Sequence, residues 1–424
     1  MLSTELRSHE IPNIFSRFRD IIEERYWLKR VSQLKSETRG NPFLRRYLQE
    51  TDDLAFGLAK CSEQVERYGL DSLQRIDKDG LLPALSIVEQ STHNNARALV
   101  GRIRGALKNP EDARALRLEL SAATHFVRKG HRVSWPETEG NGNFDLLVEG
   151  LNDVGLEVEC KSISRNKGHK IHDRDARDFH SQLAKQLEPF RKSVTQGIAV
   201  VLTVSDRLPA SPPDKKRLAI RVKNTVLSAC TEQYEDGTTV RVSEFDVKLL
   251  TGARETKNHD LARPLIDKIT GTRNRQGVVY FGDSPQGAIV FVLQSAKDDS
   301  YLFEIFATLA KSAANQMTQQ RPGLFVVGID GLSAKSLLEI GEQDFDSSRP
   351  PTGLRVELTQ FFSSLNRDHL IGTAFESQGE LEPIVHESTG DHGFRRTASV
   401  YYFPRLESRF WSKAFEGMFS EVST

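Results

Sequence analysis

The chain has 424 residues, of which 38% are hydrophobic and 27% charged, and its 58 Lys and Arg residues equal its 58 Asp and Glu residues. The length suggests two or three domains, and the balanced charge excludes a protein that attracts polyanions over its whole surface. Three cysteines without C-x-x-C spacing argue against a disulfide scaffold or a zinc ribbon and favour a reducing compartment. No apolar run is long enough for a secretory signal or a membrane span, so we expect a cytoplasmic protein without a membrane partner.

The pattern of residues predicts three regions. Residues 1–108 are polar and helical in pattern, and strand-type alternation is nearly absent there. Residues 109–205 alternate between helix and strand and form the predicted core. Residues 216–424 also alternate between helix and strand patterns. We expect them to form an α/β region of unknown role, either a domain of its own or an elaboration of the core sheet.

The predicted core begins with a clear helix signal. Asn109 can cap a helix, Pro110 is tolerated at the first helical position, and Gly130 is a plausible end. Three strands, a helix and a strand follow, over residues 132–135, 144–148, 156–163, 174–194 and 197–204. The expected order is therefore αβββαβ.

A candidate linker follows the core. Residues 206–215 contain Pro209, Pro212 and Pro213, which favour a break between domains. Beyond it we expect helices over residues 216–230 and 301–317 and strands over residues 238–247, 288–293, 323–329 and 398–403.

The most informative stretch joins two predicted strands. Side chains at positions i and i+2 of a strand point to the same face, so Glu159 and Lys161 project together, with Val158 and Cys160 buried behind. Asp145 begins the preceding strand, and a hairpin between the two strands brings it beside Glu159. Two carboxylates and one ammonium group then converge near the end of a sheet.

These side chains suit metal-assisted hydrolysis of a phosphodiester. Mg²⁺ binds through one or two carboxylates with waters, polarises the phosphate and lowers the pKa of a bound water. Lys161 can orient that water and offset charge in the transition state. Glu119 is a fourth candidate, because it lies at the margin of the apolar stripe of helix 109–130, where an unpaired acid is rare. We expect all four side chains on one side of a mixed sheet.

At this point the chain resembles the PD-(D/E)xK nuclease superfamily, which has the restriction-endonuclease-like fold. The resemblance covers residues 111–204. It implies that Asp145 and Glu159 are metal ligands, joined by the main-chain carbonyl of Cys160, and that Lys161 is the catalytic lysine.

The same resemblance implies two further roles and shows one departure. Glu119 would be the auxiliary acid on the first helix and a further metal ligand. Gln182 stands where some members carry a glutamine on a helix. Phe144 occupies the position before the aspartate, where the family pattern has a dispensable proline.

A basic stretch follows these residues. Residues 161–192 hold nine Lys and Arg residues against four acids. Arg165, Lys167 and Lys170 can lie against a phosphate backbone. The alternative interpretation is an ordinary solvated loop and helix face.

We therefore expect an α/β protein with a restriction-endonuclease-like core that acts as a Mg²⁺-dependent nuclease, with Mn²⁺ as a substitute. Nucleic acid, foremost DNA, is the expected partner, and the resemblance implies a restriction, repair or defence role; a homodimer stays open. The chief alternative is a non-catalytic module of the same fold that binds nucleic acid or a protein. A third interpretation makes Glu159 and Lys161 an ion pair on the solvated face of an edge strand.

Overall fold

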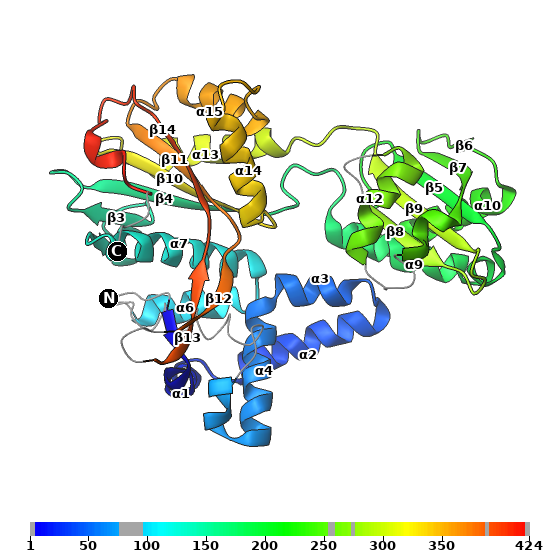
Figure 1. Cartoon of the computed structure of the whole chain (residues 1–424), viewed down its shortest axis with the longest axis horizontal. Helices are drawn as coiled ribbons and strands as arrows, with labels where there is room; N and C mark the ends of the chain where they lie inside the picture. The colour runs from blue at the N-terminus through cyan, green and yellow to red at the C-terminus, as the bar shows by residue number, and fades with distance from the viewer. Residues whose placement is uncertain (1–4, 76–95, 253–258, 273–275, 386–389, 420–424) are drawn as a thin grey trace. The chain divides into compact units, whose positions relative to one another are not determined.

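The computed structural model describes residues 5–75, 96–252, 259–272, 276–385 and 390–419. The chain divides into two compact units (Figure 1). Unit 1 consists of Met1–Leu34, Leu48–Lys167 and Tyr301–Thr424, and unit 2 of Lys35–Tyr47 and Gly168–Ser300. Both units combine helices with a mixed sheet, which confirms the predicted α/β class. Among the described residues, no helix combines the length and the apolar character that a bilayer crossing requires.

The main sheet of unit 1 has six strands in the order β14-β11-β10-β4-β3-β2. Their bounds are Val400–Pro404 (β14), Leu370–Glu376 (β11), Gly323–Ile329 (β10), Leu156–Ile163 (β4), Leu146–Glu149 (β3) and Arg132–Ser134 (β2). β10 is parallel to β4 and β11, and the other pairs are antiparallel. Because β4 is paired on both sides, the interpretation of this strand as a solvated edge is wrong.

Helices cover both faces of this sheet. α7 (Pro110–Arg128) is capped by the Asn109 side chain, as predicted, and packs Leu118 and Phe126 into one core with Val158 and Cys160. The opposite face, with Phe325 and Val327, is covered by α13 (Tyr301–Asn315), α14 (Ala334–Phe345) and α15 (Gly353–Ser363). The sheet is therefore a buried middle layer.

The N-terminal region is helical, as predicted, but it shares its core with α7. The bounds are Ile11–Ile21 (α1), Arg25–Gly40 (α2), Leu44–Thr51 (α3), Asp53–Tyr68 (α4) and Ala96–Ala106 (α6). Ala113, Leu116 and Leu120 of α7 pack among these helices, so α7 is buried on two sides. A small sheet of β1 (Glu5–Arg7), β13 (His392–Thr397) and β12 (Glu380–Val385) completes unit 1.

Unit 2 has its own sheet, in the order β6-β7-β5-β9-β8. The strands are Glu232–Gln233 (β6), Thr239–Phe245 (β7), Gly197–Val204 (β5), Ala288–Ser295 (β9) and Gln276–Phe281 (β8). α9 (Asp173–Ser193) and α10 (Pro212–Ser228) pack on one face, and α12 (His259–Thr270) on the other. The unit therefore buries a hydrophobic core of its own.

The structure groups the elements differently from the predicted domains 1–108, 109–205 and 216–424. α9 and β5 belong to unit 2, where β5 pairs with β7 and β9. The strand beside β4 is instead β10, which follows α13. α7, β2, β3, β4, α13 and β10 thus stand in the order αβββαβ, with the four-residue helix α8 (Pro136–Glu139) between β2 and β3 and residues 168–300 inserted after β4.

The proline-rich stretch over residues 206–215 separates no domains. It lies inside unit 2, and Pro212 and Pro213 open α10, where the Ser211 side chain accepts a hydrogen bond from the Asp214 N–H. These prolines predicted a break between domains, but proline in the first turn of a helix loses no intrahelical hydrogen bond.

Candidate active site at the ends of β3 and β4

Asp145 lies immediately before β3 and against β4. Leu146 pairs with Val158 in antiparallel register, so the next position along each strand sets Asp145 opposite Glu159. The main-chain N–H of Cys160 donates a hydrogen bond of 2.7 Å to Oδ2 of Asp145. The hairpin expected from the sequence forms, and it brings Asp145 to β4.

Glu159 and Lys161 share one face of β4. The Lys161 ammonium forms an ion pair with Oε1 of Glu159. The Glu159 side chain is 0% exposed and that of Lys161 21% exposed, so the lysine lies on the solvent side of the acid. Apart from this ion pair, neither carboxylate oxygen of Glu159 has a hydrogen-bond partner among the described residues. A buried acid left with so few donors is unusual, because burial of an unsatisfied polar group costs free energy.

Burial raises the pKa of both acids. Burial, followed by the negative charge of Asp145, raises the pKa of Glu159 to about 8, although Lys161 opposes the shift. Burial also raises the pKa of Asp145, against the hydrogen bond from Cys160 and the charge of Lys161. Bringing a cation to the acids would therefore release protons.

Glu119 belongs to the same electrostatic cluster but comes from the other face of the sheet. α7 packs on the face of Val158 and Cys160, whereas Glu159 and Lys161 alternate to the opposite face. The expectation that Glu119 lies on the same side of the sheet as Glu159 and Lys161 is therefore wrong. Arg102 of α6 donates a hydrogen bond of 2.5 Å to Glu119. Burial and the charge of Asp145 still raise the pKa of Glu119 to about 7.

The side chain of Cys160 is buried behind the sheet, as predicted. Burial, and then the negative charges of Asp145, Glu119 and Glu159, raise the pKa of its thiol well above the usual range, so the thiol stays protonated. In a strand, the N–H and C=O groups of one residue point to the same side. Since the N–H of Cys160 points at Asp145, its carbonyl faces that side as well.

These donors fit a hard cation only in part. Within the described ranges, no three His, Cys, Asp or Glu side chains are grouped so as to hold a metal ion. Mg²⁺, however, is commonly bound by one or two carboxylates with several waters. Asp145, Glu159 and the carbonyl of Cys160 offer oxygen donors of that kind. Among the described residues, only the Lys161 ammonium competes for the oxygens of Glu159.

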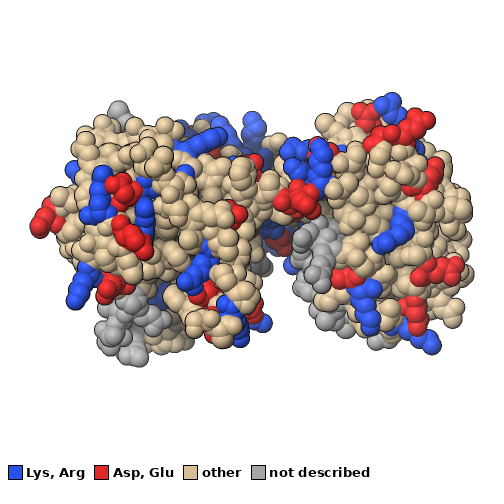
Figure 2. Space-filling model, turned by 90° about the horizontal axis from the view of Figure 1, so that it is seen from above, with Lys and Arg blue, Asp and Glu red and all other residues tan. Residues whose placement is uncertain are grey.

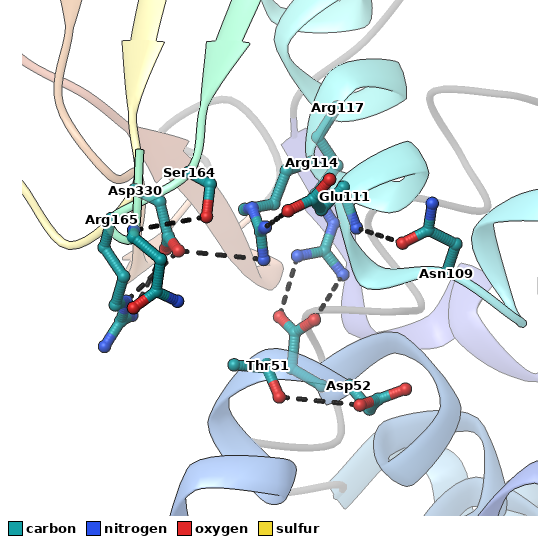
Figure 3. Close-up of polar contacts among 11 residues, drawn as sticks. Thr51, Asp52, Asn109, Glu111, Arg114, Arg117, Ser164, Arg165 and Asp330 are labelled. Atoms are coloured by element: carbon teal, nitrogen blue, oxygen red, sulfur yellow. Dashed lines mark hydrogen bonds and ion pairs between the residues drawn. The ribbon is translucent and has the colours of Figure 1, made fainter. Parts of the chain in front are cut away.

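Arg165 follows β4 and is bound by Asp330, which comes directly after β10. Its guanidinium donates to both oxygens of Asp330, at 3.1 and 3.2 Å, and Arg114 of α7 lies 3.7 Å from the same carboxylate. Figure 3 shows Arg165 and Arg114 converging on Asp330 beside Ser164. The cation predicted to meet nucleic acid is thus largely neutralised within the protein.

The other residues predicted to bind nucleic acid lie on both sides of the boundary between units. Lys167 is half-buried and is the last residue of the Leu48–Lys167 segment of unit 1, whereas Lys170 lies near the start of the Gly168–Ser300 segment of unit 2. Asp299 accepts hydrogen bonds from the main-chain N–H of Lys170 and from the His169 ring. Gln182, half-buried on α9, is also part of unit 2. Gln182 lies on a helix, as predicted, but in the unit that does not carry Glu159.

Three residues of this neighbourhood were missed from the sequence. Arg102 pairs with Glu119, and Asp330 binds Arg165. Glu376 ends β11, accepts a hydrogen bond of 2.8 Å from Ser121, and adds its charge to the acids around Cys160. The sequence could have revealed Glu376, because an acid at the end of an otherwise apolar strand is unusual.

Comparison with known proteins adds no relative: no protein-family model, no curated protein and no solved structure matches this chain.

Proposed function

We propose that this protein is a metal-dependent nuclease that hydrolyses phosphodiester bonds in DNA. The observation that carries the proposal is Glu159, a buried acid with a raised pKa that lies beside Asp145 and, among the described residues, is paired only with Lys161. Perturbed acids next to a partly exposed lysine are typical of catalytic sites. A restriction, repair or defence role belongs to the same proposal.

The order of elements supports the restriction-endonuclease-like core within this proposal. When the short helix α8 and unit 2 are left out, α7, β2, β3, β4, α13 and β10 stand in the order αβββαβ, and β10 is parallel to β4. The resemblance then extends from α7 to β10, with unit 2 as an insertion. Since Gln182 lies in that insertion, we assign it no role at the site.

Asp145, Glu159 and the carbonyl of Cys160 would hold a divalent cation, Mg²⁺ or Mn²⁺. Such an ion polarises a phosphate and lowers the pKa of a bound water. Glu159 would lose its proton to solvent on binding the ion, and without a cation the negative charge of the acids would repel a phosphate.

Lys161 and Glu119 have different tasks in this mechanism. On the solvent side of Glu159, Lys161 donates hydrogen bonds to the attacking water and to a phosphate oxygen, whose charge grows in the transition state. Glu119 is held by Arg102 on the other face of the sheet. Its charge acts on Asp145, so we propose a positioning role.

Incubation with plasmid DNA, linear duplex and RNA tests the proposal directly. We expect DNA cleavage with Mg²⁺ or Mn²⁺ and none with EDTA, because the acids need the cation to approach phosphate. Asp145→Asn is the control, since it keeps the shape of the side chain and removes its charge. If the protein binds these substrates but cuts none of them with either metal, the proposed nuclease activity is wrong.

That result would support the second candidate, a non-catalytic module of the same fold that binds nucleic acid. The observation in its favour is the ion pair between Lys161 and Glu159, which occupies both groups, together with the lack of a three-residue metal cluster in the described part of the chain.

Millimolar Mg²⁺ or Mn²⁺ is expected to raise the melting temperature of unit 1 by several degrees. A ligand at about 100 times its Kd stabilises the folded state by about 2.7 kcal/mol. The shift should be larger at pH 9 than at pH 6, since protons compete for Glu159, whose pKa is about 8. Differential scanning fluorimetry measures it, with Asp145→Asn as the control. An equal shift in wild type and this variant would mean that the ions bind elsewhere.

A further inference from the structure

The two units differ in charge. Unit 2 contains 25 Lys and Arg residues against 18 Asp and Glu residues, a formal charge of +7 in a chain whose total is +0. Unit 1, which carries Asp145 and Glu159, is therefore net acidic. On the face drawn in Figure 2, acidic and basic atoms are interspersed over both units, without one extended field of a single sign. A polyanion thus needs a local basic surface to bind.

One basic segment of unit 2 is the tip between α2 and α3, residues Lys35–Tyr47, which is its N-terminal part. Its 13 residues hold four cations and one acid. The cations are Lys35, Arg39, Arg45 and Arg46, all of them exposed. Lys35 and Arg39 are one helical turn apart on α2, so they share a face.

The tip is held on α9 by specific contacts. The Asn41 side chain donates a hydrogen bond of 2.9 Å to Asp178, and Arg177 donates one of 3.2 Å to the carbonyl of Phe43. The Arg177 guanidinium also lies 5.2 Å from the centre of the Tyr47 ring. These contacts fix the position of the tip on α9, although the two segments are more than 120 residues apart in the chain.

α9 continues the basic surface. Arg174 is 52% exposed and forms an ion pair with Glu37, the single acid of the tip. Because Glu37 is paired with Arg174, its charge does not neutralise the cations of the tip. Lys185 is exposed and lies two turns beyond Asp178 on the same face, about 10 Å along the helix. We call Lys35, Arg39, Arg45 and Lys185 the cationic surface.

These four side chains are not neutralised by the protein. Within the part of the chain that the structure describes, none of them forms an ion pair. Arg165 differs because Asp330 binds its guanidinium, and Lys167 and Lys170 differ because they are half-buried rather than exposed. The loop after β4, which the sequence favoured, is therefore expected to attract phosphate groups less strongly than the cationic surface.

We propose that the cationic surface binds the phosphate backbone of nucleic acid, outside the reacting centre and without sequence preference. The proposal rests on the proposed nuclease function for its substrate. Exposed lysines and arginines on a fixed scaffold gain affinity by releasing condensed counterions. A membrane surface fits less well, because no large apolar side chain of the tip or of α9 is exposed.

The test is the affinity of a short DNA duplex for K35Q/R39Q/R45Q, measured by fluorescence anisotropy in EDTA over a range of salt. We expect the affinity to fall by about tenfold or more, and the slope against salt to fall by about 0.9 for each phosphate that the protein no longer neutralises. The control K216Q/R217Q/K248Q removes the same charge from other exposed positions of unit 2. It should bind within about twofold of wild type. Unchanged melting temperatures show that both variants fold.

Equal affinities and salt slopes in the two triple variants would overturn the inference. So would a wild type that binds no duplex but binds vesicles of anionic lipid. Because binding is measured without metal, these outcomes are separate from the cleavage assay. A protein that binds through the cationic surface and never cuts DNA overturns only the proposed function.

Discussion

Lys161→Ala should lower the rate of DNA cleavage by about 10²–10³-fold, or below detection, because its ammonium stabilises charge that develops only in the transition state. The fold should survive. The pKa of Glu159 is about 8, so this acid is largely protonated at pH 7 and the substitution leaves no bare buried charge. Single-turnover cleavage and duplex binding, measured side by side, separate the chemical step from affinity.

The matched control is Lys335→Ala, which removes a lysine that is 86% exposed on α14. It should cleave as wild type does. Asp145→Ala should also stop cleavage but bind DNA as well as wild type or better, since it removes a negative charge that faces phosphate. If Lys161→Ala changes affinity alone and wild type cuts nothing, the binding module is the correct interpretation.

Glu159→Gln should flatten the dependence of stability on pH in the absence of metal. The ordinary pKa of Glu is 4.5, and it is about 8 for Glu159 in the folded protein. The folded state therefore holds a proton that the unfolded chain has released, so this contribution to stability is complete below pH 4.5 and is lost as the pH rises to about 8. The loss amounts to a few kcal/mol, because each unit of pKa shift is worth about 1.4 kcal/mol.

Urea unfolding between pH 5 and pH 9 measures this effect. In Glu159→Gln a smaller decline should remain and end near pH 7, since the pKa of Glu119 is about 7. Glu339→Gln is the control, because this α14 residue is 62% exposed. An unchanged pH profile in Glu159→Gln would show that Glu159 is ionised in the folded protein, which contradicts its burial beside Asp145.

Local patterns in the sequence were sufficient for the individual elements and for part of the site. The alternation over residues 156–163 predicted β4 with its bounds and both faces, and the Asn109-Pro110 signal predicted the start of α7. Asp145 was expected beside β4 because a hairpin joins strands that are neighbours in the chain. Glu119 stood out because an acid at the margin of an apolar stripe is rare. Each of these features depends on residues that are close in sequence.

Only the tertiary structure could decide which elements share a core. β5 and β10 are both short apolar strands, and an apolar strand does not specify its partner; β10 pairs with β4 across an insertion of more than 100 residues. For the same reason the sequence could not reveal that Arg102 neutralises Glu119, that Asp330 binds Arg165, or that the tip of α2 and α3 lies on α9. Periodicity records which face of an element is buried, whereas the partner of that face depends on complementary packing between distant segments.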